Sequence, residues 1–160
     1  MVQIKSNFLR LSVFALVLTL LVSCNKNVVF SDYTKIPEEG WRMDNKLKFE
    51  VDIKDNNVLH NVFLNVRHAD FYPYSNLFVF LTTTYPDGKS SIDTLECVFA
   101  DKKGKWVGDG AGDLWDNKIL LKKNLRFPQT GKYTFSFEQG MRSDPLPLIL
   151  DFGMTIEKSE

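Results

Sequence analysis

The chain has 160 residues, of which 20 are basic and 20 acidic, and its formal net charge at pH 7 is +0. This balance excludes the strong basic excess that a nucleic-acid-binding domain shows. Hydrophobic residues make up 44% of the sequence, which is enough for one buried core in a chain of this length.

The N-terminus has the pattern of an export signal. Lys5 and Arg10 precede an uncharged apolar stretch from Leu11 to Val22. A helix that spans a bilayer needs about 20 apolar residues, so this stretch is too short, and a secretory signal peptide is predicted instead. The stretch ends at Ser23-Cys24 and resembles the lipobox of bacterial lipoproteins. We therefore predict that residues 1–23 are the signal and that Cys24 is acylated.

Acylation of Cys24 would attach the protein to a membrane. A single acyl chain binds only marginally, but a lipoprotein cysteine carries several chains, so the anchor should be stable. The only other cysteine is Cys97, in a strand-like run. We interpret it as a small buried apolar residue.

The residues after the anchor show no sustained period before residue 46. We predict that residues 24–45 are the lipidated cysteine, a tether and an irregular lead-in that is partly ordered by Val28, Val29, Phe30 and Trp41. Residues 46–160 are then predicted to form one β domain.

Alternating apolar and polar residues predict strands from residue 47 onward. Leu47 to Ile53 alternates strictly, which is typical of a half-buried strand. Pro86 to Lys89 has the sequence of a hairpin turn, with Gly88 free to take a positive φ. Further strand-like stretches lie at 62–66, 77–85, 92–99, 119–122, 126–127, 132–138 and 148–156. About eight short strands predict an all-β fold, a single antiparallel β-sandwich of the jelly-roll type.

The motifs that carry chemistry are mostly absent from the sequence. His60 and His68 are the only histidines that could serve as a base; no nucleophile elbow accompanies them, and we interpret both as solvated residues on a polar strand face. Zinc-binding motifs are also missing. Asp109, Asp113 and Asp116 lie in or just after a Gly-rich run and could offer oxygen ligands to calcium, but without EF-hand spacing. We interpret that run as a tight-turning connection, with calcium binding as the alternative, and predict no enzyme activity, no cofactor and no metal.

Aromatic and charged residues gather in the loops, where a rigid scaffold can present them to a partner. The segments that we predict to form the partner surface are Phe71 to Asn76, Gly104 to Asp116 and Gln139 to Arg142. The alternative is that their rings cap an open end of the sandwich. The candidate partner-binding residues are Tyr72, Tyr74, Trp106, Asp109, Asp113, Met141 and Arg142.

Several short motifs, in their order along the chain, resemble one family. After the lipobox come Tyr-Pro-Tyr-Ser-Asn at 72–76, Asp-Thr-Leu-Glu-Cys at 93–97 and Gly-Lys-Trp at 104–106. They are followed by Phe127-Pro128 with Gly131 and Tyr133, by Gln-Gly-Met-Arg at 139–142, and by a closing Asp151-x-Gly153-x-x-Ile156-Glu157-Lys158. This set resembles GldH, a lipoprotein family of gliding motility in Bacteroidetes.

The resemblance implies an envelope protein needed for gliding, a process linked to type IX secretion, and it implies no catalytic residue. We therefore expect a lipid-anchored, non-enzymatic accessory protein of the cell envelope, at the outer membrane, that binds other envelope proteins and no nucleic acid. The alternative is a glycan-binding module of a surface polysaccharide system.

Overall fold

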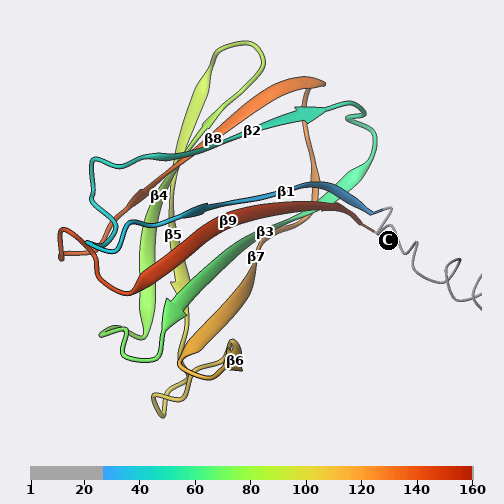
Figure 1. The fold of residues 1–160 in the computed structure, drawn as a ribbon. Helices are drawn as coiled ribbons and strands as arrows, with labels where there is room; N and C mark the ends of the chain where they lie inside the picture. Colours follow the sequence, from blue (N-terminus) through green and yellow to red (C-terminus); the bar gives the residue numbers. More distant parts are fainter. Residues whose placement is uncertain (1–26, 160) are drawn as a thin grey trace, which may run out of the picture.

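The computed structural model describes residues 27–159, and these residues form strands and no helix (Figure 1). Two antiparallel sheets pack face to face. The five-stranded sheet has the order β1-β9-β3-β7-β6, and the four-stranded sheet has the order β2-β8-β4-β5. The strands are β1 (Val28–Lys35), β2 (Leu47–Ile53), β3 (Leu59–Ala69), β4 (Asn76–Thr84), β5 (Ser90–Val98), β6 (Asp109–Ala111), β7 (Leu114–Arg126), β8 (Gly131–Gln139) and β9 (Ile149–Lys158).

This topology confirms the predicted all-β sandwich and its jelly-roll form. The chain crosses from one sheet to the other after β1, β2 and β3, pairs β4 with β5 as a hairpin, and crosses again on its way back through β7, β8 and β9. Without β6, each sheet holds four strands in the order of two interleaved Greek keys, which defines a jelly roll. The short strand β6 is an addition that pairs only with the start of β7.

The core lies between the two sheets and follows the predicted alternation. In β2 the side chains of Leu47, Phe49, Val51 and Ile53 are buried, while the residues between them are exposed. Phe137 lies 6.0 Å from Phe49 in its own sheet and 5.0 Å from Phe152 in the other, measured between ring centroids. Cys97 is buried as predicted, and burial raises the pKa of its thiol to about 12.

The lead-in is more regular than predicted. Val28–Lys35 is strand β1 and pairs with β9 along the edge of the five-stranded sheet, so from Val28 onward the chain is already part of the sandwich. Trp41, within the same segment, is fully buried against Phe152. An edge strand needs few apolar side chains because its hydrogen bonds to one neighbour hold it. The predicted signal peptide and Cys24 lie outside the described residues.

The two histidines of β3 are buried, which corrects their interpretation as solvated residues on a polar face. His60 and His68 are 3% and 0% exposed, and they share the inward face of β3 with Val62, Leu64 and Val66. The predicted stretches at 119–122 and 126–127 are parts of one long strand, β7. The predicted hairpin turn is confirmed, since Gly88 has a φ of 83°.

The sandwich has two distinct ends. Asn27 lies beside Lys158, whose backbone N–H donates to the Asn27 carbonyl over 2.8 Å, and we call this the proximal end. The opposite, or distal, end is about 33 Å away, because the 11 residues of β3 run from one end to the other at about 3.3 Å per residue. Five connections meet at the distal end, namely residues 36–46, 70–75, 99–108, 112–113 and 140–148.

Candidate functional site

The distal end is the place where the loops with the predicted partner-binding residues come together (Figure 1). These loops are far apart in the sequence, but they follow the ends of strands that are neighbours in the two sheets. Their backbones are tied to one another, for example by the Asp70 N–H, which donates to the Asp113 carbonyl over 2.8 Å. The rigid strands thus hold the loops in fixed positions, as a binding surface requires.

An aromatic cluster fills the part of the distal end under the 70–75 and 99–108 loops. His68, at the end of β3, stacks on Phe99 with a centroid distance of 4.8 Å and meets the edge of Trp106 at 4.6 Å. Tyr72 packs against both His68 and Phe99. We call these four residues the His68 cluster. It closes the distal opening of the sandwich, so that the loops above it rest on a packed layer.

Asp70 connects the His68 cluster to strand β7. One of its carboxylate oxygens accepts hydrogen bonds from the indole N–H of Trp106 over 3.0 Å and from that of Trp115 over 2.9 Å. Hydrogen bonds to a charged acceptor are stronger than bonds between neutral groups. The single carboxylate therefore fixes two large rings from different segments of the chain.

Burial sets the protonation of the cluster. Nδ1 of His68 lies 2.9 Å from the Ala69 carbonyl, which can only accept, so Nδ1 carries the hydrogen. Burial lowers the pKa of His68, while the Ala69 carbonyl and the nearby Asp70 charge oppose that shift. Burial also raises the pKa of Tyr72 well above its usual range. His68 and Tyr72 are thus both held in their neutral forms near neutral pH.

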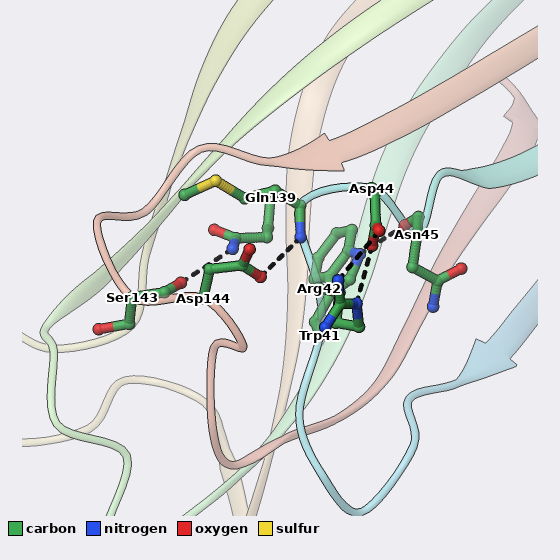
Figure 2. A network of polar contacts seen from close by, with 8 residues as sticks. Trp41, Arg42, Asp44, Asn45, Gln139, Ser143 and Asp144 are labelled. Carbon is green, nitrogen blue, oxygen red and sulfur yellow. Dashed lines mark hydrogen bonds and ion pairs between the residues drawn. The ribbon is translucent and has the colours of Figure 1, made fainter.

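A polar network fixes the other part of the distal end, where residues 36–46 meet residues 140–148 (Figure 2). The carboxylate of Asp144 accepts the backbone N–H of Met43 over 3.0 Å, and Gln139 donates its side-chain amide to the Ser143 carbonyl over 2.9 Å. The hydroxyl of Ser143 also lies 2.5 Å from that of Tyr74, which joins this network to the 70–75 loop.

The structure brings most of the predicted partner-binding residues to the distal end but buries some of them. Tyr72 and Met141 are 3% and 8% exposed, so they support the surface from within. Tyr74 and Trp106 are half-buried, whereas Asp113 and Arg142 are exposed. Asp109 lies apart from the others, because β6 places it beside a groove on the outer face of the five-stranded sheet.

The most exposed large hydrophobic side chain of the distal end is one that the predicted residue set omits. Phe71 is 82% exposed, although its neighbours Asp70 and Tyr72 are both held in place by hydrogen bonds. Val107, which is 59% exposed, lies on the adjoining 99–108 loop. The signal in the sequence was the apolar ring of Phe71 in a loop, outside any strand alternation that could bury it.

Among residues 27–159, no group of three or more His, Cys, Asp or Glu side chains is placed to hold a metal ion. No helix in the same range is long and apolar enough to cross a membrane.

Comparison with known proteins gives consistent relatives over nearly the whole chain. A family model described as GldH lipoprotein matches residues 28–156. The gliding motility lipoprotein GldH homolog of Christiangramia forsetii is 37% identical over 158 residues, which cover 93% of this chain and 96% of that protein. The gliding motility lipoprotein GldH of Flavobacterium johnsoniae is 31% identical over 148 residues, which cover 88% and 91%.

Among solved structures, one similar protein is a family GH115 4-O-methyl-alpha-glucuronidase with specificity for decorated arabinogalactans. Its TM-score is 0.42 and its sequence identity 10%, over 86% of this chain and 18% of that enzyme.

Proposed function

This chain belongs to the GldH lipoprotein family, and from that premise we propose that it is a lipid-anchored, non-enzymatic accessory protein of the gliding and type IX secretion-linked envelope machinery. In this proposal, Cys24 carries the lipid and the outer membrane is the host membrane. The distal end of the sandwich binds a second envelope protein.

The position of the anchor supports this arrangement. Cys24 precedes Asn27 by three residues, and three residues of extended chain reach at most about 11 Å. The lipid must therefore lie close to the proximal end. The distal loops, on the other side of the sandwich, are then free to face away from the membrane.

The observation that carries the proposal is the exposure of Phe71. Phe71 presents an 82% exposed ring on a loop whose backbone is held by hydrogen bonds on both sides of it. Aromatic and Arg side chains are enriched where proteins meet, and exposed Arg142 shares the distal end with Phe71. Because the loops are fixed before binding, contact with a partner would require little ordering of the chain.

The charges of the distal connections indicate what kind of partner surface this end would meet. The distal connections expose charges of both signs: Lys102, Lys103 and Lys105 lie on the 99–108 loop with Asp101, and Asp113 and Asp144 lie on two other distal connections. Charges at the rim of an interface mainly steer the encounter and select the partner. A partner surface with an apolar pocket and a rim that carries charges of both signs fits this end of the molecule.

Site-specific photo-crosslinking in the envelope tests the proposal. A photoreactive phenylalanine analogue replaces Phe71 in the full-length, lipidated protein, and crosslinked products are identified by mass spectrometry. We expect a crosslink to one envelope protein, and we expect Arg142→Ala to reduce its yield several-fold. The matched control places the same analogue at Ile92, which is 74% exposed on the four-stranded sheet. Equal products from both positions, or none from position 71, would contradict the proposal.

A further inference from the structure

The outer face of the five-stranded sheet carries an open groove that the distal loops do not form. It has a volume of about 660 Å³ and is lined by residues of β1, β9, β3, β7 and β6. These strands lie next to one another in the sheet (Figure 1). The groove is therefore a separate surface on the same rigid scaffold.

The strand register lines up charged side chains across the groove. Lys35, Asp151, Arg67 and Asp116 are cross-strand neighbours in that order on β1, β9, β3 and β7. The guanidinium of Arg67 bonds to both oxygens of Asp116, over 2.7 and 3.0 Å, and reaches Asp151 at 3.4 Å. The three groups hold one another in place, and each carboxylate keeps lone pairs for a further donor.

The next row across the sheet holds an exposed aromatic ring. Tyr33 on β1 pairs with Gly153 on β9, and Gly153 pairs with Asn65 on β3. A Cβ at Gly153 would lie 2.8 Å from the Tyr33 Cβ and 2.6 Å from the Asp32 carbonyl oxygen, so this position has room only for glycine. The groove floor here is bare backbone. An aromatic ring often covers such a glycine for stability alone, but Tyr33 remains 63% exposed.

The remaining side chains add hydrogen-bonding groups to a lining that has more carboxylates than cationic groups. The side-chain amide of Asn65 donates to the hydroxyl of Thr155 over 2.8 Å, which leaves its carbonyl oxygen free to accept. Lys118 is already paired with Glu157 over 2.8 Å. An anion would meet five lining carboxylates, those of Asp32, Asp109, Asp116, Asp151 and Glu157, against three cationic groups, of which Arg67 and Lys118 are already paired with carboxylates. Paired charges beside an open ring suit a neutral ligand that is rich in hydroxyl groups.

We propose that this groove binds a neutral glycan chain. The C–H face of one sugar ring packs on Tyr33, and its hydroxyl groups bond to Asp151, Asp116 and Asn65. A peptide fits the groove less well, because β9 and β3 are paired on both sides, and an added strand could pair only with the sheet's outer edges at β1 and β6. The inference is independent of the proposed protein partner, which uses the distal end.

Glycan-array binding tests the groove, with the full-length lipidated protein in detergent micelles as the probe. The array carries neutral hexasaccharides of β-1,3- and β-1,4-linked glucose, mannose and galactose, together with uronic acid oligomers and a random peptide set. We expect binding to at least one neutral class, and about tenfold weaker binding by Tyr33→Ala, which loses the ring contact. Asn65→Ala should weaken binding to the same glycans.

The controls separate the two surfaces. Ile92→Ala and Phe71→Ala should bind glycans as the native protein does, and Tyr33→Ala should leave crosslinking at position 71 unchanged. Each variant's melting temperature is measured to show that it is folded. Retention of only uronic acid oligomers or only peptides would overturn the proposal. So would the absence of glycan binding, or unchanged binding by Tyr33→Ala.

Discussion

Trp106 and Trp115 share one hydrogen-bond acceptor, since both indole N–H groups point to the same oxygen of Asp70. Trp106 lies on the loop after β5, and Trp115 lies near the start of β7. Through this shared carboxylate, the His68 cluster and the start of β7 hold each other in position. Trp106 therefore supports the distal surface by packing, and Phe71 is the sharper probe of a partner.

Asp70→Ala should destabilise the protein by about 2–4 kcal/mol. The change leaves two partly buried indole N–H groups without an acceptor, and each such loss costs about 1–3 kcal/mol. Urea unfolding followed by Trp fluorescence gives the free energy of unfolding. Asp113→Ala is the matched control, because its side chain is exposed, and it should change stability by less than about 0.5 kcal/mol. Similar values for the two variants would show that the shared acceptor contributes little.

Phe135→Ala should lower the free energy of unfolding by about 3–5 kcal/mol, as expected for truncating a buried Phe. Its ring is 5% exposed and lies 6.3 Å from that of Tyr133. Phe78→Ala, on the outer face of β4 and 38% exposed, serves as the control and should cost no more than about 1 kcal/mol. The reverse order of the two losses would mean that the inward face of the four-stranded sheet is assigned wrongly.

The alternation of apolar and polar side chains along the chain was enough to predict most of the fold. Strand β2 was predictable to its end residues, because every second side chain from Leu47 to Ile53 is apolar. Strand β1 was not, because its edge position makes hydrogen bonds to β9 sufficient, and its sequence includes Ser31, Asp32 and Thr34. A local apolar–polar period appears where one face of a strand is buried. The edge strand β1 buries too few side chains to show such a period.

The burial of the two histidines could have been predicted from their positions in the sequence. His60 and His68 are an even number of residues from Val62, Leu64 and Val66, so a regular strand places all five on one face. Histidine as a residue type suggested a solvent-exposed position, whereas the positions of His60 and His68 along the strand indicated that both side chains face the core. The groove around Tyr33 could not be found in this way, because it depends on strands that are neighbours in the sheet and distant in the chain.

Stability should fall as the pH drops from 7 to 5. Burial lowers the pKa of both His60 and His68, so in this range the unfolded chain binds protons that the folded chain resists. The stabilising effect is complete above the unfolded pKa of about 6.5 and is lost as the pH falls below it. Each histidine can contribute a slope of up to about 1.4 kcal/mol per pH unit, measured by urea unfolding at several pH values.

A double variant isolates the histidines from the acidic residues. His60→Leu combined with His68→Phe replaces both buried histidines with apolar side chains that do not titrate. The double variant should flatten the slope of unfolding free energy between pH 7 and 5, whatever its effect on stability at pH 7. The single change His68→Phe should remove part of the slope. If the double variant retained the full slope, protonation of carboxylates would have to explain the pH dependence.

Cys24→Ala should abolish lipidation and release the protein from the membrane fraction. The acyl chains are the predicted anchor, and a protein without them keeps no comparable membrane affinity. Metabolic labelling with a clickable fatty-acid analogue, followed by gel fluorescence, measures the incorporation. Cys97→Ala is the matched control, because that thiol is buried in the domain, and it should be labelled like the native protein. Label in the Cys24→Ala protein would refute the anchor assignment.

The anchor should also orient the domain on the bilayer. Only about 11 Å of chain can separate Cys24 from Asn27, while the sandwich is about 33 Å long, so its proximal end must stay near the lipid surface. A fluorophore at Asn57, in the proximal β2–β3 turn, should be quenched by spin-labelled lipid headgroups more strongly than one at Lys103, in the distal 99–108 loop. Both residues are in turns where a label fits without disturbing the core. The lipidated protein in vesicles is compared with Cys24→Ala, in which both positions should lose quenching. Equal quenching at the two positions would mean that the sandwich lies on its side, and that the distal loops do not face away from the membrane.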